Sequence, residues 1–217
     1  ITYYIKKNQS NVAVYETRRM LAEAEAENYA QGIASCYRML ANLYLSQNTY
    51  QLAYENFRRE IEVLEKNGID DINLPTQYAS MAQCALELNM PDSALVALRR
   101  AEALKPASDY QRFTVGKAYA LYYLRQKNYA AAKRYVDGME QLFRDNPAMA
   151  VYHRGLGFLQ REYYKAVGDY PRALESALAV QRDSTQNYGD FNINRDLGDI
   201  YLLMGEESYF IDALSDR

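Results

Sequence analysis

Residues 75–106 read PTQYASMAQCALELNMPDSALVALRRAEALKP, and the stretch contains two helical patterns separated by a turn. Small residues at Ala82, Ala85 and Ala94 lie beside bulky residues at helical spacing. Pro91 suits the first position of the second helix, because a backbone N–H at that position would be unpaired in any case. The alternation of small and large residues lets two helices approach closely. This stretch therefore predicts a helical hairpin.

The spacing within this hairpin recurs along the chain. A Tyr or Ala near the end of one helix is followed nine residues later by an Ala on the next helix, at regular steps of roughly 40 residues. The pairs are Tyr4 and Ala13, Tyr44 and Ala53, Ala85 and Ala94, Tyr123 and Ala132, and Tyr164 and Ala173. This recurrence predicts a chain of similar hairpins.

The repeated hairpin resembles the tetratricopeptide repeat (TPR), whose signature combines bulky, small and aromatic positions on two helices with a closing Pro. The signature positions are occupied by Met81, Ala82, Ala85, Ala94, Leu98, Ala101 and Pro106. The repeat period here is longer than that of the minimal motif. The resemblance implies an all-α fold, in which antiparallel hairpins stack into a right-handed superhelix, or α-solenoid.

We expect a single TPR-like repeat domain over residues 1–217. Its complete repeats cover about residues 32–71, 72–108, 109–147 and 148–188, with partial repeats at 1–31 and 189–217. Solenoid repeats need polar caps at both ends. Because both ends fall inside a hairpin, we expect the chain to be a fragment of a longer protein.

Composition excludes several classes of protein. The chain is 49% hydrophobic and 24% charged, with a net charge of −3, so it carries no basic footprint for nucleic acid. The apolar run at residues 118–124 is too short to span a bilayer. Cys36 and Cys84 form no CxxC motif and are expected to be buried thiols.

Few residues suggest catalysis or metal binding. His153 is the only histidine, and the glycines of residues 155–157 follow no predicted strand and lie in a predicted helix. Residues 70–71 are both Asp and are expected in a polar loop between repeats. Most carboxylates are spread with Lys and Arg, as on solvated helix faces. We predict that the chain is not an enzyme and has no cofactor or metal.

The resemblance also implies where a ligand binds. In TPR proteins the first helix of each hairpin lines a concave groove, and the matching positions here combine both charges with a row of Leu. Such a surface suits a peptide or protein segment better than a polyanion. Alternatively, the row of Leu45, Leu86, Leu124 and Leu202 packs against neighbouring helices. The groove positions are Arg38, Asn42, Leu45, Gln83, Leu86, Glu87, Lys117, Leu121, Leu124, Arg125, Phe158, Glu162, Lys165, Arg195 and Asp199.

One kind of TPR groove can be excluded. Arg38 and Asn42 look like the basic and Asn pair with which some TPR domains hold the C-terminal carboxylate of chaperones. Ser80, Thr114 and Ala118 stand where that clamp has an Asn and two basic residues. The clamp is incomplete, so a chaperone C-terminus is not the expected ligand.

Residues 32–57, GIASCYRMLANLYLSQNTYQLAYENF, are similar to long-period repeats in the sensor regions of bacterial histidine kinases and related membrane-bound regulators. They are also similar to repeats in cytosolic regulators. The resemblance implies a sensing or docking region and slightly favours the extracytoplasmic, periplasmic side.

Two other functions stay open. One is a structural scaffold subunit that self-assembles through its ends or its convex face. The other is the regulatory domain of an enzyme whose catalytic domain lies outside this sequence. We expect neither nucleic acid nor membrane contact by this segment.

Overall fold

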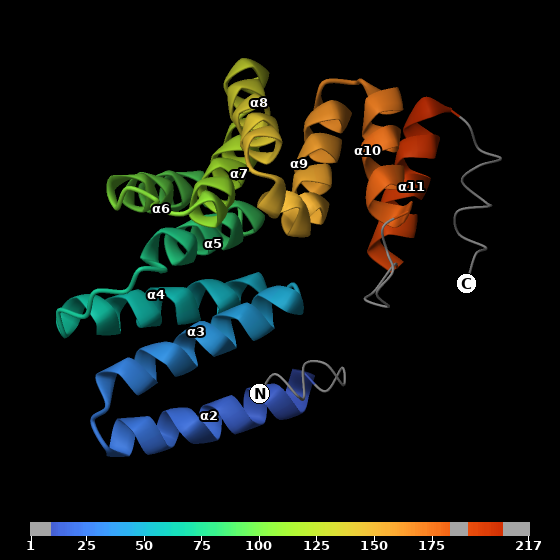
Figure 1. The fold of residues 1–217 in the computed structure, drawn as a ribbon. Helices are drawn as coiled ribbons and strands as arrows, with labels where there is room; N and C mark the ends of the chain where they lie inside the picture. The colour runs from blue at the N-terminus through green and yellow to red at the C-terminus, as the bar shows by residue number, and fades with distance from the viewer. Residues whose placement is uncertain (1–9, 183–190, 206–217) are drawn as a thin grey trace. The chain divides into compact units, whose positions relative to one another are not determined.

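The computed structural model describes residues 10–182 and 191–205, and those residues contain helices and turns but no strand (Figure 1). This confirms the predicted all-α class. The helices are α2 (Ser10–Ala26), α3 (Ala30–Ser46), α4 (Tyr50–Lys66), α5 (Leu74–Glu87), α6 (Pro91–Ala103), α7 (Asp109–Arg125), α8 (Tyr129–Asp145), the 3-10 helix η1 (Pro147–Tyr152), α9 (His153–Ala166), α10 (Tyr170–Arg182) and α11 (Phe191–Met204).

The chain forms two compact units, Ile1–Ala118 and Tyr119–Arg217. The first contains α2 to α6 and the start of α7. The second contains the rest of α7 and α8 to α11. Residues 1–9 of the first partial repeat, which include Tyr4, and residues 206–217 of the last partial repeat lie outside the described residues.

In the first unit, α3 with α4 and α5 with α6 form the hairpins that the repeat predicts. Ala41 and Ala53 are fully buried, together with Phe57, in a cluster that also contains Leu40, Tyr44 and Cys84. A larger side chain at either Ala would force the helices apart.

The turns within the hairpins explain why the repeat can be read from the sequence. Each turn has one residue in the left-handed region: Asn48 (φ 56°), Asn89 (φ 57°), Lys127 (φ 55°) and Gly168 (φ 78°). The N–H after that residue donates to a carbonyl five residues back, as in a Schellman motif. The acceptors are Tyr44 (2.9 Å), Ala85 (2.8 Å), Tyr123 (2.9 Å) and Tyr164 (2.9 Å), which are the first members of four of the pairs that define the repeat.

In the second unit, a 3-10 helix precedes α9. Residues Pro147–Tyr152 form the 3-10 helix η1, and α9 starts only at His153. The side chain of Asn146 accepts a hydrogen bond from the N–H of Ala148 at 3.1 Å, and Met149 is buried. This local cap fixes a tight turn in place of the first α-helical turn.

Close packing in the second unit also involves a glycine. A Cβ on Gly157 would lie 2.4 Å from Cγ2 of Val180, so α9 and α10 approach too closely there for a side chain. Ala173 and Ala177 are fully buried on α10, with Leu197 and Ile200 of α11.

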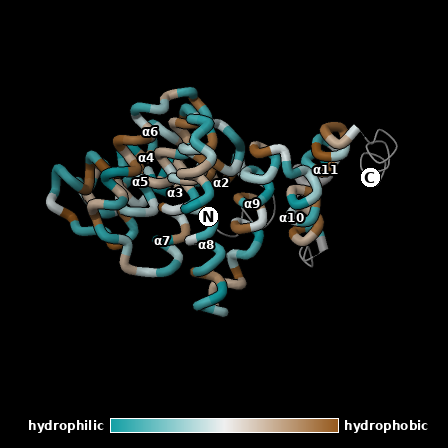
Figure 2. The backbone as a smooth tube through the Cα atoms, turned by 90° about the horizontal axis from the view of Figure 1, so that it is seen from above, coloured by the Kyte–Doolittle hydropathy of each residue, from teal (hydrophilic) through white to brown (hydrophobic). Residues whose placement is uncertain are grey.

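No described helix is long and apolar enough to cross a membrane. In Figure 2 hydrophobic and hydrophilic segments alternate along the helices, as expected where each helix buries only one face.

Candidate functional site

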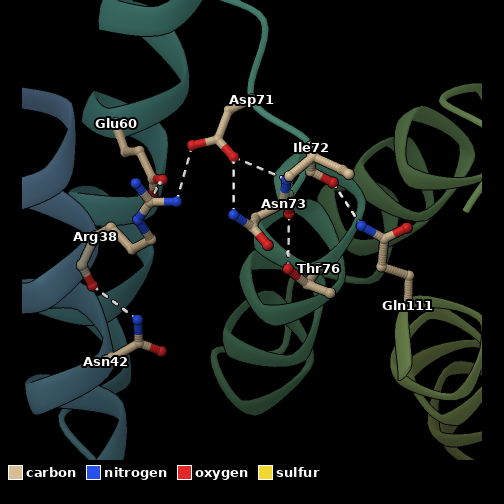
Figure 3. A network of polar contacts seen from close by, with 8 residues as sticks. All are labelled: Arg38, Asn42, Glu60, Asp71, Ile72, Asn73, Thr76 and Gln111. Carbon is tan, nitrogen blue, oxygen red and sulfur yellow. Dashed lines mark hydrogen bonds and ion pairs between the residues drawn. The ribbon is translucent and has the colours of Figure 1, made fainter. Parts of the chain in front are cut away.

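Among the predicted groove positions of the first unit, Arg38 has the clearest contacts. Its Nη1 lies 2.8 Å from Oδ2 of Asp71, and its Nε lies 3.5 Å from Oε1 of Glu60. The side chain of Arg38 is 22% exposed, that of Asp71 7% and that of Glu60 0%. Arg38 therefore links α3 to α4 and to the loop that precedes α5 (Figure 3).

The loop around Asp71 is fixed from several directions. Oδ1 of Asp71 accepts hydrogen bonds from the backbone N–H of Asn73 at 2.8 Å and from its side-chain Nδ2 at 3.0 Å. From α7, Nε2 of Gln111 donates to the carbonyl of Ile72 at 2.5 Å (Figure 3). Residues 71–73 are thus held by groups from α3 and α7 in addition to their own turn. Of the two aspartates predicted in this loop, Asp71 therefore has a structural role, because it fixes the 71–73 loop.

The charges of Asp71 and Glu60 differ because their surroundings differ. Burial raises the pKa of Asp71, but the hydrogen bonds from Asn73 and the charge of Arg38 outweigh it, and the net pKa is lowered. Burial raises the pKa of Glu60 to about 8, against the smaller effect of Arg38. Neither carboxyl oxygen of Glu60 has a hydrogen-bond partner among the described residues. Glu60 is therefore mostly protonated at neutral pH, and Arg38 is balanced by Asp71.

Glu60 corrects the expectation that the carboxylates lie on solvated faces. The sequence around it alternates acids and bases, which is typical of a surface. Its burial depends on the packing of α3 and the 71–73 loop over α4, and neither contact is local in sequence.

The other groove positions of the first unit differ in accessibility. Asn42 is exposed, and its Nδ2 donates to the carbonyl of Arg38 at 2.9 Å. Gln83 is half-buried and Glu87 is exposed on α5. Lys117 is half-buried, and burial lowers its pKa.

The Leu row separates into buried and exposed members. Leu86 is only 4% exposed, and Leu45 packs against the cluster around Phe57. In the second unit, Leu124 packs against the cluster around Leu159, whereas Leu202 is 55% exposed. Leu45, Leu86 and Leu124 thus pack internally, at least in part.

In the second unit, three predicted groove positions of α9 lie around Arg161, which was not among the predicted site residues. The guanidinium of Arg161 lies 4.9 Å from the ring centroid of Phe158 and 3.2 Å from Oε1 of Glu162. Nζ of Lys165 lies 3.9 Å from the same Glu162 oxygen. Nη1 of Arg161 pairs with Oδ2 of Asp196 on α11 at 2.6 Å.

The remaining groove positions of the second unit lie on α7 and α11. Leu121 packs against the cluster around Leu159, and Arg125 is exposed. Arg195 and Asp199 are exposed on α11, one helical turn apart. The positive charge of Arg195 also acts on the neighbouring Asp196. The α11 positions therefore continue the charged surface around Arg161.

The importance of Arg161 could have been recognised from its place in the repeat. It stands three residues before Tyr164, where the earlier hairpins have Ala41, Ala82 and Ala120. Each of those three is fully buried. A long charged side chain at a position otherwise reserved for buried Ala indicates a paired, structurally engaged residue.

The described residues show few groups suited to chemistry. They contain no group of three or more His, Cys, Asp or Glu residues placed to hold a metal ion. Nδ1 of His153 lies 2.8 Å from the carbonyl oxygen of Ala150. Cys36 and Cys84 are buried free thiols, and burial raises the pKa of Cys84 to about 12. Such thiols are poor nucleophiles at neutral pH.

Comparison with known proteins finds no matching family model and no matching curated protein. Several solved structures are similar. BtubC (BKLC) from P. vanneervenii is 16% identical, with a TM-score of 0.61 over 94% of this chain and 87% of that chain.

Two further solved structures are also similar to this chain. A tetratricopeptide repeat protein from Parabacteroides merdae is 15% identical, with a TM-score of 0.55 over 98% of this chain and 73% of that chain. PilW, a widely conserved type IV pilus biogenesis factor, is 12% identical, with a TM-score of 0.62 over 98% of this chain and 86% of that chain. The chain has a TPR-like fold.

Proposed function

We propose that this chain is a non-catalytic module that binds a peptide or protein segment along the exposed face of its first helices. The observation that carries the proposal is the exposure of Asn42 and Glu87, with the half-buried Gln83 between them in sequence, at predicted groove positions of α3 and α5. Amide and carboxylate side chains offer both donors and acceptors, which a peptide backbone can use.

Within this proposal, the main role of Arg38 is to hold the 71–73 loop in place and not to bind the ligand. Asp71 already takes the close hydrogen bond of its guanidinium. Arg38 therefore holds the 71–73 loop beside α3, while the neighbouring Asn42 can turn its amide oxygen toward a ligand. Lys117 adds a half-buried amine to the proposed surface of the first unit.

The second unit would contribute separately. Phe158, Glu162 and Lys165 combine an aromatic ring with both charges around the buried Arg161. Such a set suits a peptide side chain with an apolar stem and a polar tip. Arg125, Arg195 and Asp199 add charged groups on α7 and α11 of the same unit.

A narrower form of the proposal is a sensing or docking region of a bacterial signalling protein, such as a membrane-bound histidine kinase. The sequence resemblance of residues 32–57 supports it. Sequencing the continuing reading frame tests it. We expect the reading frame to encode a transmembrane segment and a kinase domain beside this chain. An unrelated catalytic domain would contradict the sensor role but would not contradict peptide binding.

Affinity capture from native extract tests peptide or protein binding. The groove variant carries Asn42→Ala, Gln83→Ala and Glu87→Ala. A control variant carries Gln51→Ala, Glu62→Ala and Asn67→Ala, which remove the same kinds of side chain from exposed positions on or next to α4. Both are first checked for parental helicity.

The proposal predicts one or more proteins that are retained by the parent and the control variant and lost by the groove variant. Equal retention by all three chains would contradict it. Recovery of this chain alone would favour the scaffold function instead.

A further inference from the structure

Two pockets in the first unit lie away from the groove positions. One, of about 400 Å³, is formed by α2, α3 and α4. The other, of about 300 Å³, is formed by α4, α5, α6 and the loop after α4. Neither contains a residue at a predicted groove position.

The pockets share a set of three residues, which we name the Glu–Tyr–Arg set. In the first pocket the set is Glu25, Tyr37 and Arg59, and in the second it is Glu65, Tyr78 and Arg100. The two glutamates are one repeat period apart in the sequence, and so are the two tyrosines and the two arginines. Each set therefore occupies the same place in successive hairpins.

The contact between tyrosine and glutamate is the same in the two sets. The hydroxyl of Tyr37 donates to Oε1 of Glu25 at 3.3 Å, and that of Tyr78 donates to Oε1 of Glu65 at 2.9 Å. The guanidinium carbon of Arg59 lies 5.8 Å from the ring centroid of Tyr37. Both tyrosines lie on first helices, both glutamates on the second helix before them, and both arginines on the second helix after them.

Both pockets open on a side of the first helices that differs from the groove side. On α3, Tyr37 and Tyr44 line the first pocket, whereas Arg38 and Asn42 are groove positions. At 3.6 residues per turn, the pocket and groove positions of α3 and α5 lie roughly 130–150° apart around each helix. One ligand cannot occupy both sides of a helix, so the pockets form a separate surface.

The chemistry of each set matches a peptide group. Arg59 and Arg100 are exposed and have guanidinium donors for a carbonyl oxygen. Glu25 and Glu65 are exposed carboxylates, each with lone pairs beyond the one that the tyrosine uses, for a backbone N–H. In the first pocket the half-buried ring of Tyr37 gives an apolar face for the flat peptide unit or the next side chain, whereas Tyr78 is only 8% exposed and holds Glu65 through its hydroxyl.

Charge and repetition select among the possible ligands. Each set pairs one acid with one base, so neither a polyanion nor a polycation is favoured. A small molecule would use one pocket, whereas a chain with repeating polar groups would use both. In the first pocket, Arg18 adds a further guanidinium, whose Nη2 donates to the hydroxyl of Tyr44 at 2.7 Å.

We propose that the two pockets form a second binding surface, for an extended peptide segment whose backbone pairs with the Glu–Tyr–Arg sets of successive hairpins. This surface does not depend on the proposed groove function. The side chains of the peptide matter less here than its backbone, because the shared contacts are with peptide groups.

The experiment uses decapeptides selected on the parent chain from a random display library. Their affinities are measured by fluorescence anisotropy with the pocket variant, Arg59→Gln with Arg100→Gln. The matched control is Arg58→Gln with Arg99→Gln, which changes the adjacent exposed arginines and gives the same net charge. The groove variant defined above is measured beside them.

We expect a class of peptides that binds the pocket variant at least about tenfold more weakly and binds the control and groove variants like the parent. Methylation of central backbone nitrogens should weaken this class more than Ala replacement of the same residues. The proposal is overturned if no selected peptide binds the pocket variant more weakly than the parent. It is also overturned if the control variant loses as much affinity as the pocket variant. Peptides lost only with the groove variant would overturn this second surface and support the groove.

Discussion

Arg38 and Asp71 lie far apart in the sequence and form an ion pair of 2.8 Å that joins α3 to the loop before α5. This pair explains why a residue of the predicted groove is also a structural residue. The 71–73 loop ends one hairpin and begins the next, so the pair fixes the junction between two repeats.

Replacing Arg38 by Ala should lower the free energy of unfolding by about 3 kcal/mol, because the buried Asp71 carboxylate loses its ion pair and keeps only the hydrogen bonds from Asn73. Urea unfolding followed by helicity measures the change. Arg58→Ala is the control, because Arg58 forms an exposed pair with Glu62, worth about 0.5 kcal/mol. Equal stability of the two variants would show that the Arg38–Asp71 pair does not hold the junction.

Glu60 should make stability depend on pH. Its pKa is raised to about 8 in the folded chain from an ordinary value of 4.5, so the folded state keeps a proton that the unfolded state loses. The contribution of Glu60 is complete below about pH 4.5 and is lost as the pH rises to 8, with a slope of at most about 1.4 kcal/mol per pH unit.

Glu60→Gln removes this titration and nearly preserves the shape of the protonated side chain. Urea unfolding at pH 5, 6, 7 and 8 should show the variant gaining stability relative to the parent as pH rises. Glu62→Gln, at an exposed position on the same helix, should track the parent. A constant difference between Glu60→Gln and the parent would mean that Glu60 does not titrate in this range.

Leu98 is fully buried on α6, and Val96 on the same helix is 60% exposed. Leu98→Ala should therefore cost about 2–5 kcal/mol of unfolding free energy through lost burial and a cavity. Val96→Ala should change it by less than about 0.5 kcal/mol. If Leu98→Ala unfolded at the same urea concentration as the parent, the assignment of buried faces would be wrong.

Lys127 occupies a left-handed turn position that its counterparts in the other hairpins fill with Asn or Gly. Lys127→Gly should raise the free energy of unfolding by about 0.5–1 kcal/mol, because Gly adopts a positive φ without steric cost. Gly168→Ala tests the same effect in reverse and should cost about 1 kcal/mol. Among the described residues, no atom lies within 4 Å of a Cβ built at Gly168, so a loss of stability there is due to the backbone. Opposite signs for the two changes are expected in thermal unfolding.

The fold could be predicted from the sequence because its signals are local. The Tyr44 and Ala53 pair marks a turn whose Schellman hydrogen bond joins Tyr44 to the nearby Thr49. Small residues such as Ala82 mark places where helices touch. Both signals recur from hairpin to hairpin, so a weak pattern at one site is reinforced by the others.

The site was harder to predict, because its contacts join distant residues. The sequence identified Arg38 and Asn42 by register but could not show that Asp71 pairs with Arg38. It placed Leu86 and Leu202 in one row, although packing buries the first and exposes the second. The departure of Arg161 from the small-residue pattern was visible, but its partner Asp196 lies on another helix.

Recognition of a protein segment by the exposed face of the first helices can be tested by amide hydrogen exchange of the parent chain, with and without its captured partner. We expect new protection in α3 and α5 around Asn42 and Glu87. Protection confined to α4 and α6, or none at all, would contradict it.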